Sequence, residues 1–121
     1  MHLAAIARER GDDASATTAL GEAVRLYHDL GDPRRIAECT EQAAYLAWAM
    51  ARMQRTARLL GAAAALRAEI GAPLQATERG VHDRIEVNVR VALGNGAFHT
   101  EWAAGRGLTR DRLVAEVVRD S

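Results

Sequence analysis

The chain has 121 residues, which is about one domain and is long enough to bury a core without the help of disulfides. Its 16 basic residues, all arginine, are balanced by 16 acidic residues, so no long-range field favours binding to nucleic acid or to an anionic membrane. Cys39 is the sole cysteine, which excludes an internal disulfide and favours a reducing cytoplasm. The longest apolar runs, 43–51 and 59–66, are shorter than the roughly 20 residues that span a bilayer, and no secretory signal follows Met1. We therefore expect a soluble, cytoplasmic protein with no membrane contact and no direct nucleic acid contact.

The first part of the chain predicts four helices, because apolar residues recur at helical spacing between Gly and Pro boundaries. These helices cover residues 2–10, 14–30 and 33–51, followed by a fourth that includes 57–70. Gly11, Gly31 and Gly71 end three of them, since glycine accepts a positive φ at no steric cost. Pro33 is tolerated in a first helical turn and opens the third. The many alanines raise helix propensity and let helix axes approach closely, so we expect tightly packed antiparallel pairs.

Residues 75–93 carry two patterns at once. Val81, Ile85 and Val89 are spaced as in a helix, whereas apolar residues alternate with polar ones over 85–91 as in a strand. A lone strand would leave its backbone groups unpaired, so we predict a helix here.

The next segment predicts a short helix. Gly94, Asn95 and Gly96 interrupt the preceding helix, and residues 97–104 form the new one, which ends at Gly105. Together with the other segments, this predicts an all-α domain of six or seven helices.

Thr109 is a good N-cap for a last helix, with Leu108 and Leu113 placed to form a hydrophobic staple around it. The apolar residues of this helix would dock it on the body of the domain: Leu113, Val114, Val117 and Val118.

The chain also repeats itself at an offset of forty residues. Residues 1–33 placed on 41–73 pair Leu20 with Leu60, Gly21 with Gly61, Ala23 with Ala63, Leu26 with Leu66, Gly31 with Gly71, and Pro33 with Pro73. Gly and Pro mark backbone positions rather than general hydrophobicity, so these matches are informative. A helical period near forty is typical of stacked helical hairpins, which usually hold a partner rather than do chemistry.

The two copies resemble tetratricopeptide repeats of the longer kind. Each has a small residue in its first helix, Ala4 or Ala44, and small and large apolar residues in its second: Ala16, Leu20 and Ala23 in one copy, Leu60 and Ala63 in the other. The second copy departs from the pattern, with Ala51 where the turn has glycine and Thr56 where it has alanine. This favours a tighter, helical turn in the second copy.

Residues 56–121 resemble, more specifically, the C-terminal end of large bacterial signalling ATPases and transcriptional regulators of the actinobacterial LuxR and AfsR kind. The segments that carry the resemblance are 57–63, 70–74 and 102–106. It implies an α-α superhelix with two tetratricopeptide-like hairpins over 1–73, the first truncated, and C-terminal capping helices over 74–121. In that family such a tail follows a nucleotide-binding domain, but this chain has no lysine with which to build a phosphate-binding loop.

No residue set predicts catalysis, a metal site or a cofactor. The four histidines are scattered, and none forms the i, i+4 pair with a nearby carboxylate that a helical metal site needs. We interpret His82 as a solvated or capping residue and Cys39 as a structural thiol. Gly105-Arg106-Gly107 lacks the preceding strand of a dinucleotide fingerprint and is interpreted as a helix stop and linker. The chain is therefore predicted not to be an enzyme.

The resemblance to tetratricopeptide repeats also implies a concave groove for a peptide, a protein or a small ligand. Its inward positions map to Arg8, Glu38, Glu41, Tyr45 and Trp48. Tyr45 and Trp48 lie three residues apart and share a helix face, as the aromatic anchor of a groove would. The alternative is that both rings belong to the core or are covered by the segment after Pro73.

An apolar surface is predicted at the N-terminal end, where the first helix is about half the length of its counterpart. Its residues are Leu3, Ile6, Ala19, Val24 and Tyr27. In isolation this surface would pair two chains as a two-fold dimer, which Ile6→Glu would convert to a monomer.

These observations predict a non-catalytic binding or sensor module from the C-terminal part of a bacterial signalling regulator. The expected partners are a protein or peptide, including other domains of a parent regulator. A free-standing adapter or oligomerisation domain of the same fold is the alternative.

Overall fold

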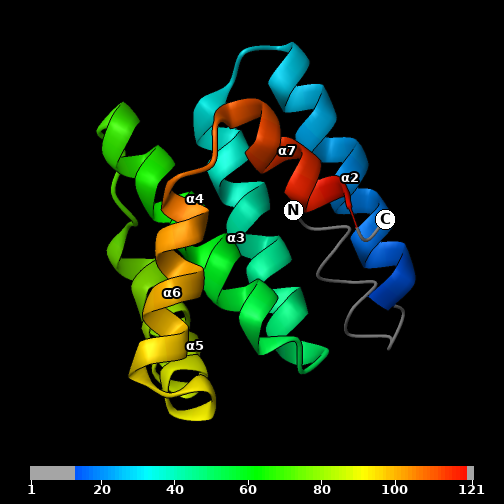
Figure 1. Ribbon diagram of the computed structural model, residues 1–121. Coiled ribbons are helices and arrows are strands. Elements are labelled where there is room, and N and C mark those ends of the chain that lie inside the picture. The colour runs from blue at the N-terminus through cyan, green and yellow to red at the C-terminus, as the bar shows by residue number, and fades with distance from the viewer. Residues whose placement is uncertain (1–12, 120–121) are drawn as a thin grey trace.

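The computed structural model describes residues 13–119, and within this range it consists of six α-helices joined by short turns (Figure 1). They are α2 (Asp13–Asp29), α3 (Pro33–Ala49), α4 (Met53–Ile70), α5 (Ala76–Leu93), α6 (Asn95–Arg106) and α7 (Arg110–Val118). The predicted all-α class is confirmed. The helix predicted over 2–10 lies outside the described residues. None of the described helices is both long and apolar enough to cross a membrane.

The helix α4 occupies the centre of the arrangement. It packs extensively against α3 and against α6, while α2 packs on the other side of α3. The connections at 30–32 and 50–52 turn the chain back, so that α2, α3 and α4 run alternately up and down (Figure 1). The last helix, α7, lies over α2 and α3, whereas α5 and α6 lie at the opposite side of the molecule.

The core consists of two clusters. The larger one fills the space among α2, α3, α4 and α7, and its fully buried members include Val24, Ile36, Leu59 and Val117. The smaller one lies where α4, α5 and α6 meet, and consists of Ala57, Ile85, Val89 and Phe98. As predicted, Leu113, Val114 and Val117 dock the last helix on the body.

Three helices end in the same left-handed turn. Gly31 after α2 has φ +67° and Gly71 after α4 has φ +64°, as expected for helix-ending glycines. Ala51 after α3 adopts φ +60° in the same position, and the next N–H, of Arg52, donates to the Ala47 carbonyl over 2.8 Å. The prediction of a tighter, helical turn at Ala51 is therefore wrong, because the capping hydrogen bonds hold an alanine where glycine is the usual residue.

The forty-residue repeat corresponds to equivalent positions in α2 and α4. Leu20 and Leu60 are both buried, and each helix closes through a hydrogen bond from the residue after its final glycine. The equivalence ends after these glycines. Pro33 begins α3 directly, whereas Pro73 lies in an extended connection before α5.

The ambiguous segment 85–91 is helical, as predicted. Ile85 and Val89 point into the smaller core cluster, whereas Val87 and Val91 are exposed on the other side of α5. The apparent strand-like alternation thus arises because both faces of one helix carry β-branched residues. The start of α5 is fixed by the side chain of Glu78, which accepts from the Gln75 N–H over 3.0 Å.

The boundaries of α6 differ from the prediction. The helix begins at Asn95, after the single joint residue Gly94, and continues through Gly105 to Arg106. Gly105 is not a helix stop, because it lies inside α6 at the contact with α4. The predicted cap of the last helix is confirmed, since the Thr109 hydroxyl accepts from the Arg112 N–H over 3.3 Å.

Candidate functional site

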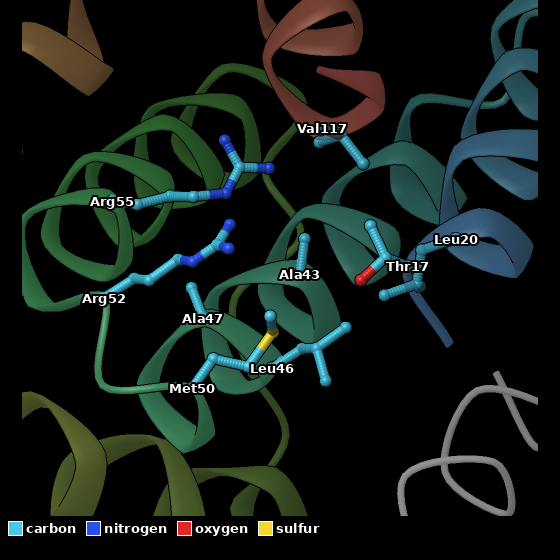
Figure 2. Close-up of a pocket in the computed structure, with 9 residues that line it drawn as sticks. All are labelled: Thr17, Leu20, Ala43, Leu46, Ala47, Met50, Arg52, Arg55 and Val117. Atoms are coloured by element: carbon cyan, nitrogen blue, oxygen red, sulfur yellow. The ribbon is translucent and has the colours of Figure 1, made fainter. Parts of the chain in front are cut away.

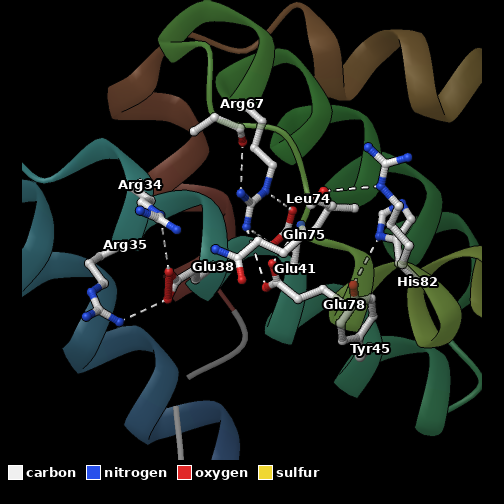
Figure 3. Close-up of polar contacts among 12 residues, drawn as sticks. Arg34, Arg35, Glu38, Glu41, Tyr45, Arg67, Leu74, Gln75, Glu78 and His82 are labelled. Carbon is white, nitrogen blue, oxygen red and sulfur yellow. Dashed lines mark hydrogen bonds and ion pairs between the residues drawn. The ribbon is translucent and has the colours of Figure 1, made fainter.

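One face of α3 carries the four predicted groove residues that the structure describes. Glu38, Glu41, Tyr45 and Trp48 follow one another along this face, and the segment after Gly71 together with α5 lies against it (Figure 3). Arg8, the fifth predicted groove residue, lies outside the described residues.

Glu41 forms a buried ion pair with Arg67 of α4. The Arg67 Nε donates to Glu41 Oε2 over 2.6 Å and the Arg67 Nη2 donates to Oε1 over 2.8 Å, which is the bidentate geometry of a strong charge-assisted pair. The two side chains are only 5% and 7% exposed. A third Arg67 nitrogen donates to the carbonyl of Ala72 over 2.9 Å, and the hydrogen bonds that Arg67 donates to Glu41 raise the pKa of Arg67. Both oxygens of the Glu41 carboxylate are therefore bound to Arg67 within the protein.

Tyr45 links α3 to α5. Its hydroxyl lies 3.0 Å from the Nδ1 of His82, and the two rings meet edge to face with centroids 6.1 Å apart. Burial, with a smaller contribution from the charge of Glu41, raises the pKa of the Tyr45 hydroxyl well above its ordinary value, so the tyrosine stays protonated. The interpretation of His82 as a solvated or capping residue is wrong, because α5 turns this side chain toward α3.

The remaining residues of this face differ in exposure. Glu38 pairs with Arg35 over 3.1 Å and lies 4.0 Å from Arg34, at the end of α3 that α5 does not cover (Figure 3). Trp48 is half-buried and packs against the smaller core cluster. The predicted groove face is therefore polar and open at Glu38, and closed by internal contacts from Glu41 to Trp48.

A small pocket, open to solvent, lies where α2, α3, the start of α4 and the end of α7 meet (Figure 2). The wall is mostly apolar, with Leu20, Leu46 and Met50 among its residues. Arg52 and Arg55 also line it, and Figure 2 shows their guanidinium groups pointing the same way, into the space. None of the four groove residues that the structure describes lines this pocket.

Glu116 of α7 forms ion pairs with three arginines beside the pocket. Its carboxylate lies 3.4 Å from Arg55 and 3.5 Å from Arg119, and it also accepts from Arg58. Arg58 in turn pairs with Glu101 of α6 over 3.2 Å. These contacts tie α7 and α6 to the central helix, and no sequence pattern pointed to them because the partners are far apart in the chain.

The predicted N-terminal surface is only partly within the described residues, since Leu3 and Ile6 lie outside them. Ala19 and Tyr27 are half-buried, and Tyr27 packs against the larger core cluster. Val24 is fully buried where α2 meets α3 and α7, so its assignment to a free surface is wrong.

No group of three or more His, Cys, Asp or Glu side chains within residues 13–119 is placed to hold a metal ion. Cys39 is a buried thiol, and burial raises its pKa to about 11, which disfavours the nucleophilic thiolate. No protein-family model, curated protein or solved structure matches this chain at significant similarity.

Proposed function

We propose that this chain is a non-catalytic helical-repeat module that binds a protein, peptide or small ligand, as the C-terminal part of a bacterial signalling or transcriptional regulator. The observation that carries the proposal is the pair of equivalent helices, α2 and α4, which share buried leucines and left-handed closing glycines at a forty-residue offset. Stacked helical hairpins of this period usually present surfaces to partners. The resemblance of residues 56–121 to the ends of LuxR-like and AfsR-like regulators supplies the cellular role.

The open surfaces support binding on the side where α2, α3 and α7 meet. Glu41 and Tyr45 are engaged in contacts within the protein, and so is Arg55, which pairs with Glu116, so the pocket beside Met50 offers mainly its apolar wall. An apolar side chain of a partner matches this wall, which would bury it.

A first experiment tests the proposed origin. An epitope tag placed after Ser121 in the chromosomal gene reports the size of the native polypeptide on a denaturing gel. A product several times larger than the 13.1 kDa of this chain is expected. A product of about this mass instead would favour the alternative, a free-standing adapter or oligomerisation domain.

A second experiment tests binding at the pocket. A photo-crosslinking amino acid replaces Met50 in the tagged protein, and a matched control carries it at the exposed Ala104 of α6. Irradiation of living cells is expected to give a discrete adduct from position 50 and none from position 104. Equal labelling at both positions, or none at position 50, would count against a partner at the pocket.

A further inference from the structure

The helix α5 exposes three valines to solvent. Val81 is 52% exposed, Val87 57% and Val91 79%, and all three lie on the helix that forms one side of the molecule (Figure 1). Neither of the two core clusters includes them. Valine also has a lower helix propensity than alanine or leucine, so helix stability does not explain three exposed valines.

The exposed residues follow the spacing of a helix-pairing seam. Positions on this outer face are separated by three and four residues in turn, and all are exposed: Thr77, Gly80, Arg84, Val87 and Val91. Alternating steps of three and four place side chains along one stripe that faces a partner helix. The buried residues of α5, Ile85 and Val89, lie on the other side and hold the helix on α4 and α6.

We propose that this face pairs with the same face of a second copy of the chain, with the two α5 helices antiparallel about a two-fold axis between Arg84 and Val87. This geometry puts Gly80 opposite the partner's Val91. Apart from the nearby backbone of α5 itself, no described atom lies within 4 Å of a Cβ placed on Gly80, so the glycine leaves room for the valine. Arg84 then lies opposite the partner's Val87, where its aliphatic stem covers the valine and its charge reaches water.

The flanking charges fit the antiparallel direction. Asp83 and Arg90 lie beside the seam on the same edge, seven residues apart, and both are exposed. An antiparallel pair places Asp83 next to the partner's Arg90 at both ends, which gives two ion pairs, each between an aspartate and an arginine. A parallel pair would instead place the two Arg84 side chains against each other. Within its own chain Arg90 lies 3.8 Å from Glu86 and over the Phe98 ring, on the side of α5 that meets α6, so its guanidinium must turn from these partners to reach the partner's Asp83.

This surface is separate from the pocket, none of whose lining residues belongs to α5. It lies on the side of the molecule away from α2 and α7 (Figure 1). Pairing through α5 therefore leaves the pocket free, and the proposed binding function and the α5 dimer can fail independently of each other.

The experiment measures the mass of the 121-residue chain by sedimentation equilibrium at concentrations from one to several hundred micromolar. A dimer is expected, and the double substitution Val87→Glu and Val91→Glu is expected to give a monomer. The control is Ala92→Glu, which adds one negative charge at an exposed α5 position outside the seam and is expected to remain dimeric. Far-ultraviolet circular dichroism confirms that each variant keeps its helices.

Charge reversal tests the direction of pairing without removing an apolar residue. Asp83→Arg alone is expected to raise the dissociation constant at least tenfold. Adding Arg90→Asp to the same chain is expected to restore it to within about threefold. A wild-type monomer at several hundred micromolar, a dimer that Ile6→Glu dissociates and Val87→Glu does not, or a double reversal that stays as weak as the single one would overturn the proposal.

Discussion

Gly61 of α4 and Gly105 of α6 lie at the same helix crossing, where the two backbones are in direct contact. A Cβ built at Gly61 would fall on the carbonyl oxygen of Trp102 and lie 2.8 Å from its carbon, and one built at Gly105 would fall on the carbonyl of Arg58. The obstructing atoms belong to backbone and cannot move aside as a side chain can. The close approach of α4 and α6 therefore depends on both glycines.

Gly105→Ala is expected to destabilise the fold by at least about 2–3 kcal/mol, because the two helices must separate to admit one methyl group. Gly96→Ala, also in α6, is the control. No described atom lies within 4 Å of its built Cβ, so it is expected to be neutral or to stabilise by up to about 1 kcal/mol. Urea denaturation of both variants measures the difference, and equal stabilities would refute the packing role.

Ala51→Gly is expected to stabilise the protein by about 1 kcal/mol, because an alanine at φ +60° carries a steric cost that glycine avoids. Ala49→Gly, two residues earlier and in the last turn of α3, is the opposite case and should destabilise by up to about 1 kcal/mol. Thermal unfolding of the two variants reports the sign directly. A lower melting temperature for Ala51→Gly would contradict the left-handed turn.

The Glu41–Arg67 pair should show the behaviour of a buried ion pair. Glu41→Leu leaves a buried guanidinium without its carboxylate and is expected to cost about 3 kcal/mol, whereas adding Arg67→Met should recover most of that loss. The control is Glu69→Ala, which breaks the exposed pair with Arg110 and should cost less than about 1 kcal/mol. A double-mutant cycle by chemical denaturation that found no coupling would argue against the bidentate contact.

Stability is expected to fall at alkaline pH through Cys39. Burial raises the pKa of this thiol from 9.0 to about 11, so between these values the unfolded chain loses its proton while the folded chain keeps it. The unfolded state then binds fewer protons, and the free energy of unfolding decreases as pH rises, by at most about 1.4 kcal/mol per pH unit. In Cys39→Ala the decrease should begin about one pH unit higher. There the unfolded chain starts to lose the Tyr45 proton, whose ordinary pKa is 10.0, while burial keeps the folded tyrosine protonated. Denaturation curves at half-unit steps from pH 8 to 11 measure both onsets.

Nucleotide and metal binding are expected to be absent from this chain. It has no lysine for a phosphate-binding loop, and residues 13–119 contain no cluster of metal-ligating side chains. Calorimetric titration with Mg-ATP should give only heats of dilution, and elemental analysis of the purified protein should give no stoichiometric metal. Micromolar ATP binding would show that the non-catalytic proposal is incomplete.

Local signals predicted the helices well, because their causes lie within a few residues. Gly31, Gly71 and Thr109 each act on the backbone beside them, and the structure has them ending or capping helices as expected. Gly105 was misassigned because the same residue type serves both as a helix stop and as a contact point. Only the neighbouring helix distinguishes the two roles.

The candidate site could be predicted only in part, because its contacts join distant segments. The mapping from tetratricopeptide repeats named Glu41 and Tyr45 together, and both lie on α3. It could not show that Arg67, 26 residues away, takes up the carboxylate, or that His82, 37 residues away, meets the tyrosine. Each of these partners is supplied by a helix whose position depends on the packing of the whole domain.

Gly94 is both the end of α5 and the residue before α6, with φ +83° and ψ 154°, a region of backbone space that essentially only glycine occupies. The direction of one entire helix relative to the next is thus set by two torsion angles of one residue. Lengthening this joint by a few flexible residues would leave the composition of both helices unchanged and yet remove this constraint. The packing of Ile85 and Val89 and the contact between Tyr45 and His82 would then have to hold α5 in its direction without help from the joint.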